Sequence, residues 1–126
     1  MNTPSNLKYS KTHEWVEFTD DSTATIGLTD FAQKKLGKLV FVNLPMVGDV
    51  ISAEQTFGDV ESVKAVSDVV SPIDGTVTEV NEELLDVPGM INDDPYGAWL
   101  IKVSDVTDND DLMTAEEYED FCAKEA

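Results

Sequence analysis

The sequence predicts a mainly β protein, a flattened barrel-sandwich of two small antiparallel sheets, with one short helix near 29–36 and another at the C-terminus. Short runs rich in Val, Ile and Thr alternate with period two, as half-buried strands do. Turn-forming pairs that contain Gly or Pro separate these runs. The length suits a single domain, 1–126, with a core at about 7–103 and an acidic loop and C-terminal helix at 104–125.

The strands expected from this alternation lie in four segments. They are residues 23–28, 39–44, 75–80 and 99–103. The turns expected between strands are Gly48-Asp49, Gly58-Asp59, Asp74-Gly75, Pro88-Gly89 and Asp94-Pro95. Strands this short and closely spaced favour a sandwich or a barrel.

A weak internal repeat relates two stretches of the chain. Residues 45–50 and 72–77 share the pattern P-x-x-G-x-V. Two matching half-units of this kind are expected to build two related sheets. The segment 51–71 would then link them, and it contains the most distinctive lysine of the chain.

The short helix is expected near 29–36 because its boundary residues suit the two ends of a helix. Thr29 suits the N-cap, Asp30 places an acid in the first turn, and Gly37 suits the position after the last turn. Three lysines crowd the end of this helix: Lys34, Lys35 and Lys38. They either complement the helix dipole as solvated charges or mark this surface for a partner protein.

The C-terminal helix carries a start signal and an apolar stripe. Thr114 and Glu117 form a T-x-x-E capping box. Tyr118, Phe121 and Cys122 follow at i, i+3 and i+4, so they share one face that is expected to pack on the body of the protein. Cys122 is therefore expected to be a small buried apolar residue rather than a reactive thiol.

The stretch 104–111 is rich in Asp and is expected to be a solvated loop. Counted from Asp108, it places Glu119 at the bidentate position of a calcium-binding loop. Met113, however, occupies the position at which such a loop requires Gly. We therefore expect no metal site here.

The composition narrows the classes of partner. The chain has 26 acidic residues, 8 lysines and a net charge of −18, which disfavours nucleic acid and anionic membranes because both bind clustered Lys and Arg. No apolar run approaches the roughly 20 residues of a membrane span, and the first residues resemble no targeting signal. The single cysteine favours a reducing compartment. We expect a monomer in the cytoplasm.

One lysine stands apart from the others. Valines on both sides of Lys64 predict a hairpin with this lysine at a protruding tip, between Val63 and Ala65. No other base lies within ten residues of Lys64, whereas five acids do: Glu54, Asp59, Glu61, Asp68 and Asp74. The lysine either offsets an acidic surface or is displayed for modification by another protein.

The motifs E-S-V-K-A at 61–65 and S-P-I-D-G-T-V at 71–77 resemble the lipoyl-attachment hairpin of the glycine cleavage system H protein family. Matches to H-E-W-V at 13–16 and I-G-L-T-D-F-A-Q at 26–33 extend the resemblance, which covers about residues 7–125. It implies a lipoyl/biotinyl-type fold. Biotin carriers typically have methionines on both sides of the lysine, and free-standing lipoyl domains lack the H-E-W strand and the C-terminal helix.

The resemblance implies a carrier protein and not an enzyme. Lipoate would be attached covalently to Lys64, and the arm would shuttle the aminomethyl group of glycine. The implied partners are the glycine decarboxylase (P protein), the aminomethyltransferase (T protein), dihydrolipoamide dehydrogenase (L protein) and lipoate-attaching enzymes. A tethered group meets each partner at a high effective concentration.

The resemblance also implies further site residues. Glu61 would help lipoate-attaching enzymes to recognise the hairpin. A surface cleft for the loaded arm would involve five residues: Thr12, His13, Glu14, Ser67 and Asp68. Glu14 and Asp68 could pair with a cationic amine. From the residues alone, the two acids could equally be ordinary surface charges, and His13 is more readily explained as a packing or hydrogen-bonding residue beside Trp15.

Two alternatives remain open. Relatives that relay octanoyl or lipoyl groups to other lipoyl domains share the same hairpin. An acidic β-rich binding module without a cofactor would need no modified lysine. The chain also departs from the family, because many relatives have a histidine at the position of Phe31 and acids at those of Lys34 and Lys35.

Overall fold

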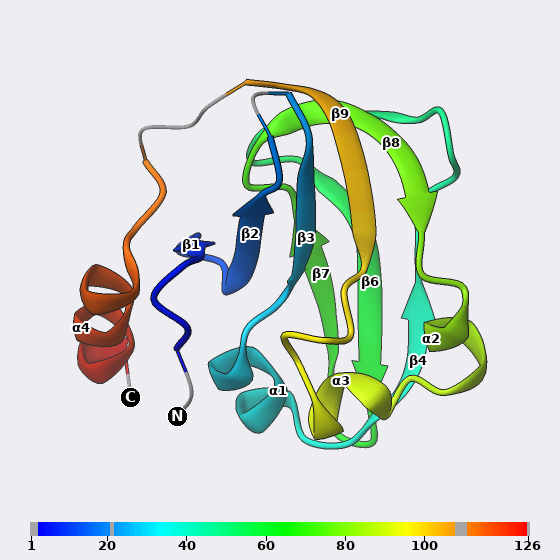
Figure 1. Ribbon diagram of the computed structural model, residues 1–126. Coiled ribbons are helices and arrows are strands. Elements are labelled where there is room, and N and C mark those ends of the chain that lie inside the picture. Colours follow the sequence, from blue (N-terminus) through cyan, green and yellow to red (C-terminus); the bar gives the residue numbers. More distant parts are fainter. Residues whose placement is uncertain (1–2, 21, 108–110, 126) are drawn as a thin grey trace.

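The structure, a computed structural model, describes residues 3–20, 22–107 and 111–125. Its strands form two antiparallel sheets, and Figure 1 shows these sheets as two facing layers. The six-stranded sheet contains β1 (Lys8–Tyr9), β2 (Glu14–Phe18), β3 (Ala24–Leu28), β9 (Ile101–Thr107), β8 (Asp74–Val80) and β5 (Val50–Ile51), in that order. The three-stranded sheet contains β4 (Leu39–Asn43), β6 (Thr56–Ser62) and β7 (Val66–Val70). The mainly β sandwich expected from the sequence is confirmed.

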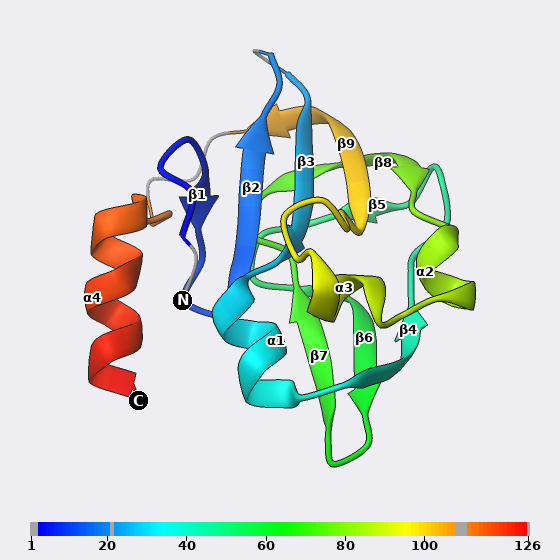
Figure 2. The same cartoon turned by 60° about the horizontal axis from the view of Figure 1, so that its bottom comes forward.

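In the part of the chain that the structure describes, four helices lie around the two sheets. They are α1 (Asp30–Leu36), α2 (Glu83–Asp86), α3 (Met90–Asp93) and α4 (Ala115–Glu125). Helices α1 and α3 contact each other at the end of the sandwich from which the β6–β7 hairpin projects, whereas α4 lies outside β1 (Figure 2). No helix in the described part of the chain is long and apolar enough to cross a membrane.

The buried side chains form two clusters. The larger fills the space between the sheets and includes Ile26, Val60 and Ile101, all almost fully buried. The smaller holds α4 against β1 and β2, with Tyr9 stacked on Tyr118 at a ring-centroid distance of 4.7 Å. The second cluster explains why an amphipathic C-terminal helix can dock beside an edge strand.

The caps predicted for both main helices are confirmed. The Thr29 hydroxyl accepts a hydrogen bond from the Ala32 amide at the start of α1. At the start of α4, the Thr114 amide donates to Glu117 Oε1 at 2.9 Å, and the Glu117 amide donates to Thr114 Oγ1 at 3.3 Å. Helices α1 and α4 therefore both begin where the sequence predicts.

Cys122 is buried in the smaller cluster, as expected. Burial is the main cause that raises the pKa of its thiol. A buried thiol with a raised pKa is a poor nucleophile.

Three local predictions are wrong. Strand β9 continues to Thr107, so the first part of the expected acidic loop is sheet; residues 108–110 of that loop, including Asp108 of the calcium-loop count, lie outside the described residues. Gly58 and Asp59 lie inside β6, at a register shift. Gly75 likewise lies inside β8 and pairs with Ile51.

Gly58 resembles a turn residue in sequence but is needed in the strand for a different reason. A Cβ at this position would collide with the Asn43 carbonyl oxygen on the neighbouring strand. Close approach of two backbones, rather than a change of chain direction, explains this glycine.

The prediction that the internal repeat builds two related sheets is also wrong. Each copy leads from the three-stranded sheet into the six-stranded one, after β4 in the first case and after β7 in the second. The copies then pair with each other, with Val50 opposite Thr76. The repeat thus marks two equivalent crossovers that join the layers.

Candidate functional site

Lys64 lies in the turn of the β6–β7 hairpin, which projects beyond the rest of the sandwich (Figure 2). The Ser62 amide donates to the Ala65 carbonyl oxygen at 2.8 Å and closes the turn. The Ser62 hydroxyl also accepts from the amides of Lys64 at 3.3 Å and Ala65 at 3.1 Å. A buried serine therefore shapes the turn, and the lysine side chain is left exposed.

The tip is also attached to the segment between α1 and β4. The Val63 amide donates to the Lys38 carbonyl oxygen at 3.3 Å. The Lys64 side chain passes close to Gly37, where an added Cβ would lie 3.4 Å from Lys64 Cε. Within the described residues, Lys64 has no ion-pair partner. Its backbone is held in place while its amine stays available.

A cleft of about 360 Å³ begins beside the hairpin tip, and we call it the hairpin cleft. It lies between the hairpin strand β7, the segment that leads into β2, and helix α1. Its lining residues are Thr12, His13, Glu14, Leu28, Ala32, Lys35, Leu36, Val60, Ala65, Val66, Ser67, Asp68 and Val69. All five residues predicted for a cleft are among them, and Ala65 places the cleft directly next to Lys64.

Glu14 is the most unusual group in the hairpin cleft. Its side chain is 1% exposed, and its carboxylate accepts hydrogen bonds from Ser10 Oγ at 2.7 Å, from Thr12 Oγ1 and from the Val70 amide at 3.3 Å. Burial raises the pKa of Glu14 to about 7, and these hydrogen bonds oppose the rise. Burial thus disfavours the charged carboxylate, and a cation placed beside it would favour that form.

The other predicted acid has a different environment. Asp68 is exposed on β7, whereas Ser67 is half-buried and lies directly opposite Val60 in the sheet. Apolar side chains from β3, α1 and β6 form the remaining wall between the acids: Leu28, Ala32, Leu36 and Val60. This combination suits a slender apolar chain that ends in a cationic group, because the chain can contact the wall while the cation meets Glu14.

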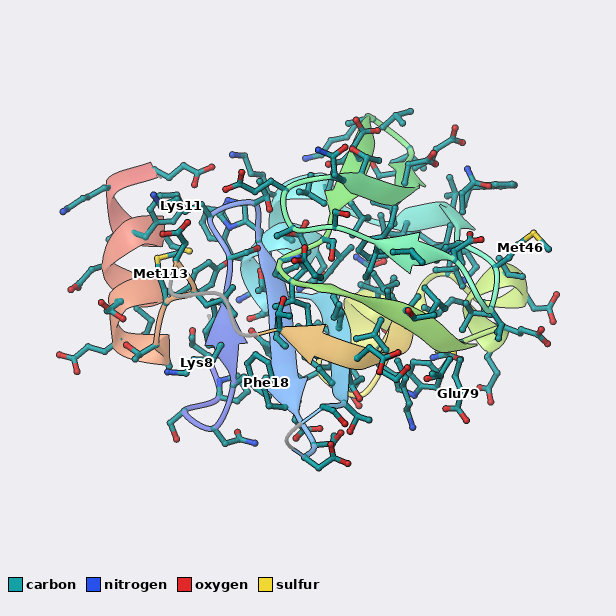
Figure 3. The ribbon with its side chains drawn as sticks, turned by 90° about the horizontal axis from the view of Figure 1, so that it is seen from above. Lys8, Lys11, Phe18, Met46, Glu79 and Met113 are labelled. Carbon is teal, nitrogen blue, oxygen red and sulfur yellow. The ribbon has the colours of Figure 1, made fainter. Side chains whose placement is uncertain are left out.

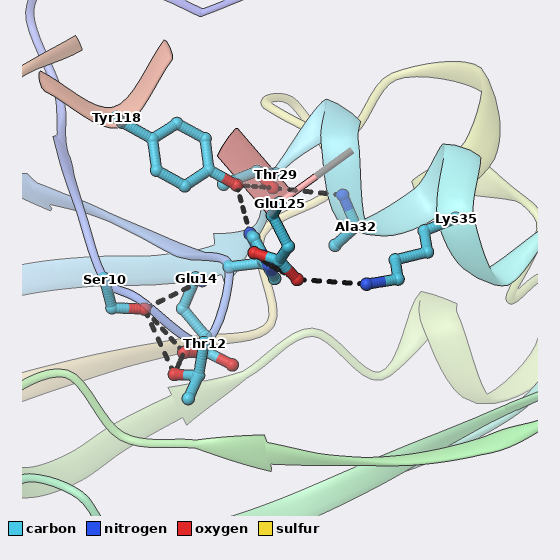
Figure 4. A network of polar contacts seen from close by, with 9 residues as sticks. Ser10, Thr12, Glu14, Thr29, Ala32, Lys35, Tyr118 and Glu125 are labelled. Atoms are coloured by element: carbon cyan, nitrogen blue, oxygen red, sulfur yellow. Dashed lines mark hydrogen bonds and ion pairs between the residues drawn. The ribbon is translucent and has the colours of Figure 1, made fainter. Parts of the chain in front are cut away.

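His13 packs on the C-terminal helix and makes polar contacts with it. Its Nδ1 lies 2.7 Å from the Tyr118 hydroxyl and its Nε2 lies 3.0 Å from Glu125 Oε2; Figure 4 labels Tyr118 and Glu125 and marks their polar contacts with dashed lines. The centroids of the His13 and Phe31 rings are 4.7 Å apart. The φ of His13, 73°, is uncommon for a residue other than glycine. The predicted packing and hydrogen-bonding role of His13 is confirmed, and its partners are Tyr118, Glu125 and Phe31.

Through Tyr118 and Glu125, α4 supports two residues that line the cleft, His13 and Lys35. The Tyr118 hydroxyl lies 2.7 Å from Thr29 Oγ1, which caps α1. Lys35 lines the cleft and pairs with Glu125 at 3.0 Å, while Lys34 pairs with Asp30 at 3.3 Å. Two of the three clustered lysines thus make ion pairs within the protein. Lys35 also lines the cleft, although α1 differs in sequence from the same helix in many relatives.

Sequence reasoning missed Ser10, Tyr118 and Glu125 as residues that organise the cleft. Ser10 and Thr12 are close to Glu14 in sequence, but they lie in the turn that precedes β2, so no strand periodicity links the three side chains. No local signal connects α4 to residue 13, since that contact spans over 100 positions. Within residues 3–20, 22–107 and 111–125, no group of His, Cys, Asp and Glu could hold a metal ion.

Comparison with known proteins supplies the remaining observations. The profile of the family described as "Glycine cleavage H-protein" matches residues 7–125. The "Glycine cleavage system H protein" of Lachnoclostridium phytofermentans is 58% identical over 120 residues, which is 95% of this chain and 94% of that protein. The protein of the same name from Carboxydothermus hydrogenoformans is 51% identical over 125 residues, 97% and 95% of the two chains.

A solved structure is similar as well. The crystal structure of a glycine cleavage system H protein from Mycobacterium marinum superposes with a TM-score of 0.90 at 41% sequence identity. The match covers 95% of this chain and 98% of that one. The likeness therefore includes both sheets and extends over nearly the whole length of each chain.

Proposed function

The chain belongs to the glycine cleavage H-protein family, and on this basis we propose that it carries its lipoyl group on Lys64 and shelters the loaded arm in the hairpin cleft. Members of this family are non-catalytic carriers with lipoate attached covalently to a lysine. The chain is accordingly a lipoyl carrier of the glycine cleavage system that transports the aminomethyl group of glycine.

The residues present fit such a group. Lys64 offers an exposed amine at a projecting turn, and a cleft with apolar walls begins at the neighbouring Ala65. When bound, lipoate supplies the redox and group-transfer chemistry of its dithiolane. The protein's own residues display the amine, exclude water through the apolar wall and offer the Glu14 carboxyl group to a cation.

One observation carries the proposal most strongly. Five residues from two distant segments, 12–14 and 67–68, line one cleft that opens beside Lys64. In this arrangement Glu14 is the main electrostatic contact for a cationic end of the arm. A cation beside its carboxylate would offset the burial that raises its pKa. Thr12 would hold the carboxylate in place, while Ser67, Asp68 and His13 would form the rim.

The chain works with other components of the glycine cleavage system. The finer assignment within our proposal is that it meets the glycine decarboxylase (P protein), the aminomethyltransferase (T protein) and dihydrolipoamide dehydrogenase (L protein) in turn. Lipoate-attaching enzymes act on it beforehand and recognise Glu61. We place it in the cytoplasm as a monomer that folds as one domain, 1–126.

The intact mass of the protein tests the attachment site. Wild type, Lys64→Arg and the neighbouring control Lys38→Arg are incubated with lipoate, ATP and a purified lipoate–protein ligase. We expect one lipoyl addition to wild type and to Lys38→Arg and none to Lys64→Arg. An addition that persists in Lys64→Arg would contradict the proposal.

A further inference from the structure

We propose that the outer face of the three-stranded sheet is the docking surface for the enzyme that acylates Lys64, with Phe41 as its main apolar contact. We call this surface the hairpin face and define it by Phe41, Val63, Val66 and Glu61. The inference rests on the proposed role of Lys64 and adds Phe41, from the neighbouring strand β4, to its recognition.

The register of the three strands brings Phe41, Glu61 and Val66 together, and Val63 follows in the adjoining turn. Phe41 of β4 lies opposite Glu61 of β6, and Glu61 lies opposite Val66 of β7. Directly opposed residues of an antiparallel pair project from the same side of the sheet. The next row confirms this, because Asn43 Nδ2 donates to Asp59 Oδ1 at 2.6 Å across the same two strands.

The row nearest the tip is apolar on both sides of one carboxylate. Phe41 is 52% exposed, Val66 66% and Val63 75%. Glu61, between the first two, makes no hydrogen bond or ion pair within the described residues. Large exposed apolar side chains that cluster are uncommon on a monomer and usually mark an interface.

The next row of residues along the sheet adds negative charge, which favours a partner with a basic surface. Asp59 and Asp68 lie opposite each other just behind Glu61 and Val66. A complementary surface would offer an apolar pocket for Phe41 beside at least one cation for Glu61. An aromatic side chain in such a pocket is the typical main contact of an interface.

The position of the reacting atom identifies the occupant. An enzyme that acylates Lys64 must bring an activated acyl carbonyl to Nζ of an unmodified side chain, so it must contact the residues beside the turn. Enzymes that act on the lipoyl group work at the end of a much longer arm and can remain farther away. The hairpin face, one row from the turn, lies within the footprint of the acylating enzyme.

Acylation of Lys64 is not a redox reaction and needs no oxidant or reductant. The neutral Lys64 amine attacks the carbonyl carbon of an acyl adenylate or acyl thioester. A C–N amide bond forms, the bond to the phosphate or thiol leaving group breaks, and nitrogen loses one proton to a base or to solvent. Docking at Phe41 contributes to the position of this amine and takes no part in bond making.

Phe41→Ser and a matched control test the proposal. The control is Phe18→Ser, which changes a 38% exposed phenylalanine at the end of β2, labelled in Figure 3. In Figure 2 that end of β2 and the β6–β7 turn lie at opposite ends of the molecule. Each unmodified protein is titrated against a purified lipoate–protein ligase with lipoate and ATP, and lipoylation is followed by intact mass. Circular dichroism and thermal unfolding verify that each variant is folded.

We expect kcat/KM to fall about tenfold or more in Phe41→Ser, mainly through a higher KM, because a central aromatic contact is lost. Phe18→Ser should stay within about twofold of wild type, and Val66→Ser should fall between the two. Phe41→Leu, which keeps an apolar side chain, should recover much of the loss and remains informative if the serine variant folds poorly.

Three outcomes separate the claims. Equal lipoylation of wild type and folded Phe41→Ser would overturn the docking face while leaving Lys64 as the attachment site. A wild-type protein that gains no mass at Lys64 would contradict the proposed function itself. Once lipoylated, Phe41→Ser should be reduced by NADH and dihydrolipoamide dehydrogenase at the wild-type rate; an equal loss there would assign the face to another partner and overturn our choice of occupant.

Discussion

The hairpin tip and the hairpin cleft adjoin each other but are built in opposite ways. The tip displays an exposed Lys64 on a turn that depends largely on one serine, Ser62, and on one contact to Lys38. The cleft contains a buried carboxylate, Glu14, with three hydrogen-bond donors from two distant segments, residues 10–12 and Val70. A lysine that several enzymes must reach needs few contacts around it. A cleft that encloses the attached arm needs residues from several distant segments of the fold.

The difference also predicts where mutations act. Changes at the tip should alter modification and leave stability nearly intact, because little is buried there. Changes in the cleft should alter stability first, because buried polar groups and packed rings are involved. Four predictions test this contrast, in order of decreasing expected effect.

Tyr118→Ala should have the largest effect. It removes a fully buried ring that stacks on Tyr9 and whose hydroxyl contacts both His13 and Thr29. We expect the free energy of unfolding to fall by about 3–5 kcal/mol, as for other buried aromatic truncations. Urea unfolding would measure it. Tyr118→Phe, which keeps the ring, should lose only about 1–2 kcal/mol, and equal losses would show that packing on β1 contributes little.

Glu14→Gln should change the pH dependence of stability. The folded pKa of about 7 lies above the ordinary 4.5, so the folded state binds the proton more tightly than the unfolded state does. Below pH 4.5 both states are protonated and burial of the carboxylate carries no charge penalty. As pH rises through 7 the wild type should lose stability, by up to about 3 kcal/mol.

The comparison of Glu14→Gln with wild type isolates this effect. The variant has no group to ionise at position 14, so its unfolding free energy should fall less between pH 5 and pH 8. Denaturant unfolding at both pH values gives the difference, in which contributions from other titrating groups cancel. Parallel pH profiles for the two proteins would contradict the raised pKa.

Ser62→Ala tests how much structure the tip requires. The hydroxyl accepts from two amides of the turn, so its loss should lower the unfolding free energy by about 1 kcal/mol. The larger consequence should be a less ordered Lys64 and slower lipoylation. Amide hydrogen exchange of residues 63–65 would detect the loosened turn, and unchanged exchange would show that the turn does not depend on Ser62.

Lys64→Ala should have the smallest effect on stability. The side chain is exposed and makes no ion pair in the described part of the chain, so the unfolding free energy should change by less than about 0.5 kcal/mol. Lipoylation should be lost completely. A large destabilisation, measured by the same urea titration, would mean that the contact with Gly37 holds the tip in place.

The sequence predicts the tip better than it predicts the cleft. Valines on both sides of Lys64 are a local signal, and the hairpin they predict is present. The helix caps at Thr29 and Thr114 are local as well and are confirmed. Thr12, Glu14, Ser67 and Asp68 could be grouped only through a family resemblance, because they come together through the packing of β2 against the hairpin.

The features that sequence reasoning missed depend on tertiary contacts. Glu14 resembles a surface acid until Ser10 and Val70 enclose it. His13 could not be assigned to α4, since the contact with Tyr118 forms only when the helix docks. Gly58 was mistaken for a turn residue because nothing near it in sequence reveals the Asn43 carbonyl oxygen on the adjacent strand.

NMR of side-chain methyl groups in the lipoylated protein tests the central claim most directly. Glycine and the glycine decarboxylase are added to load the arm, and spectra are compared before and after loading. If the loaded arm rests in the hairpin cleft, the methyl signals of Leu28, Ala32 and Val69 should shift, although all three lie away from the hairpin turn. Unchanged signals of Leu28, Ala32 and Val69, with shifts confined to Val63 in the turn, would show that the arm stays in solvent and would contradict the account.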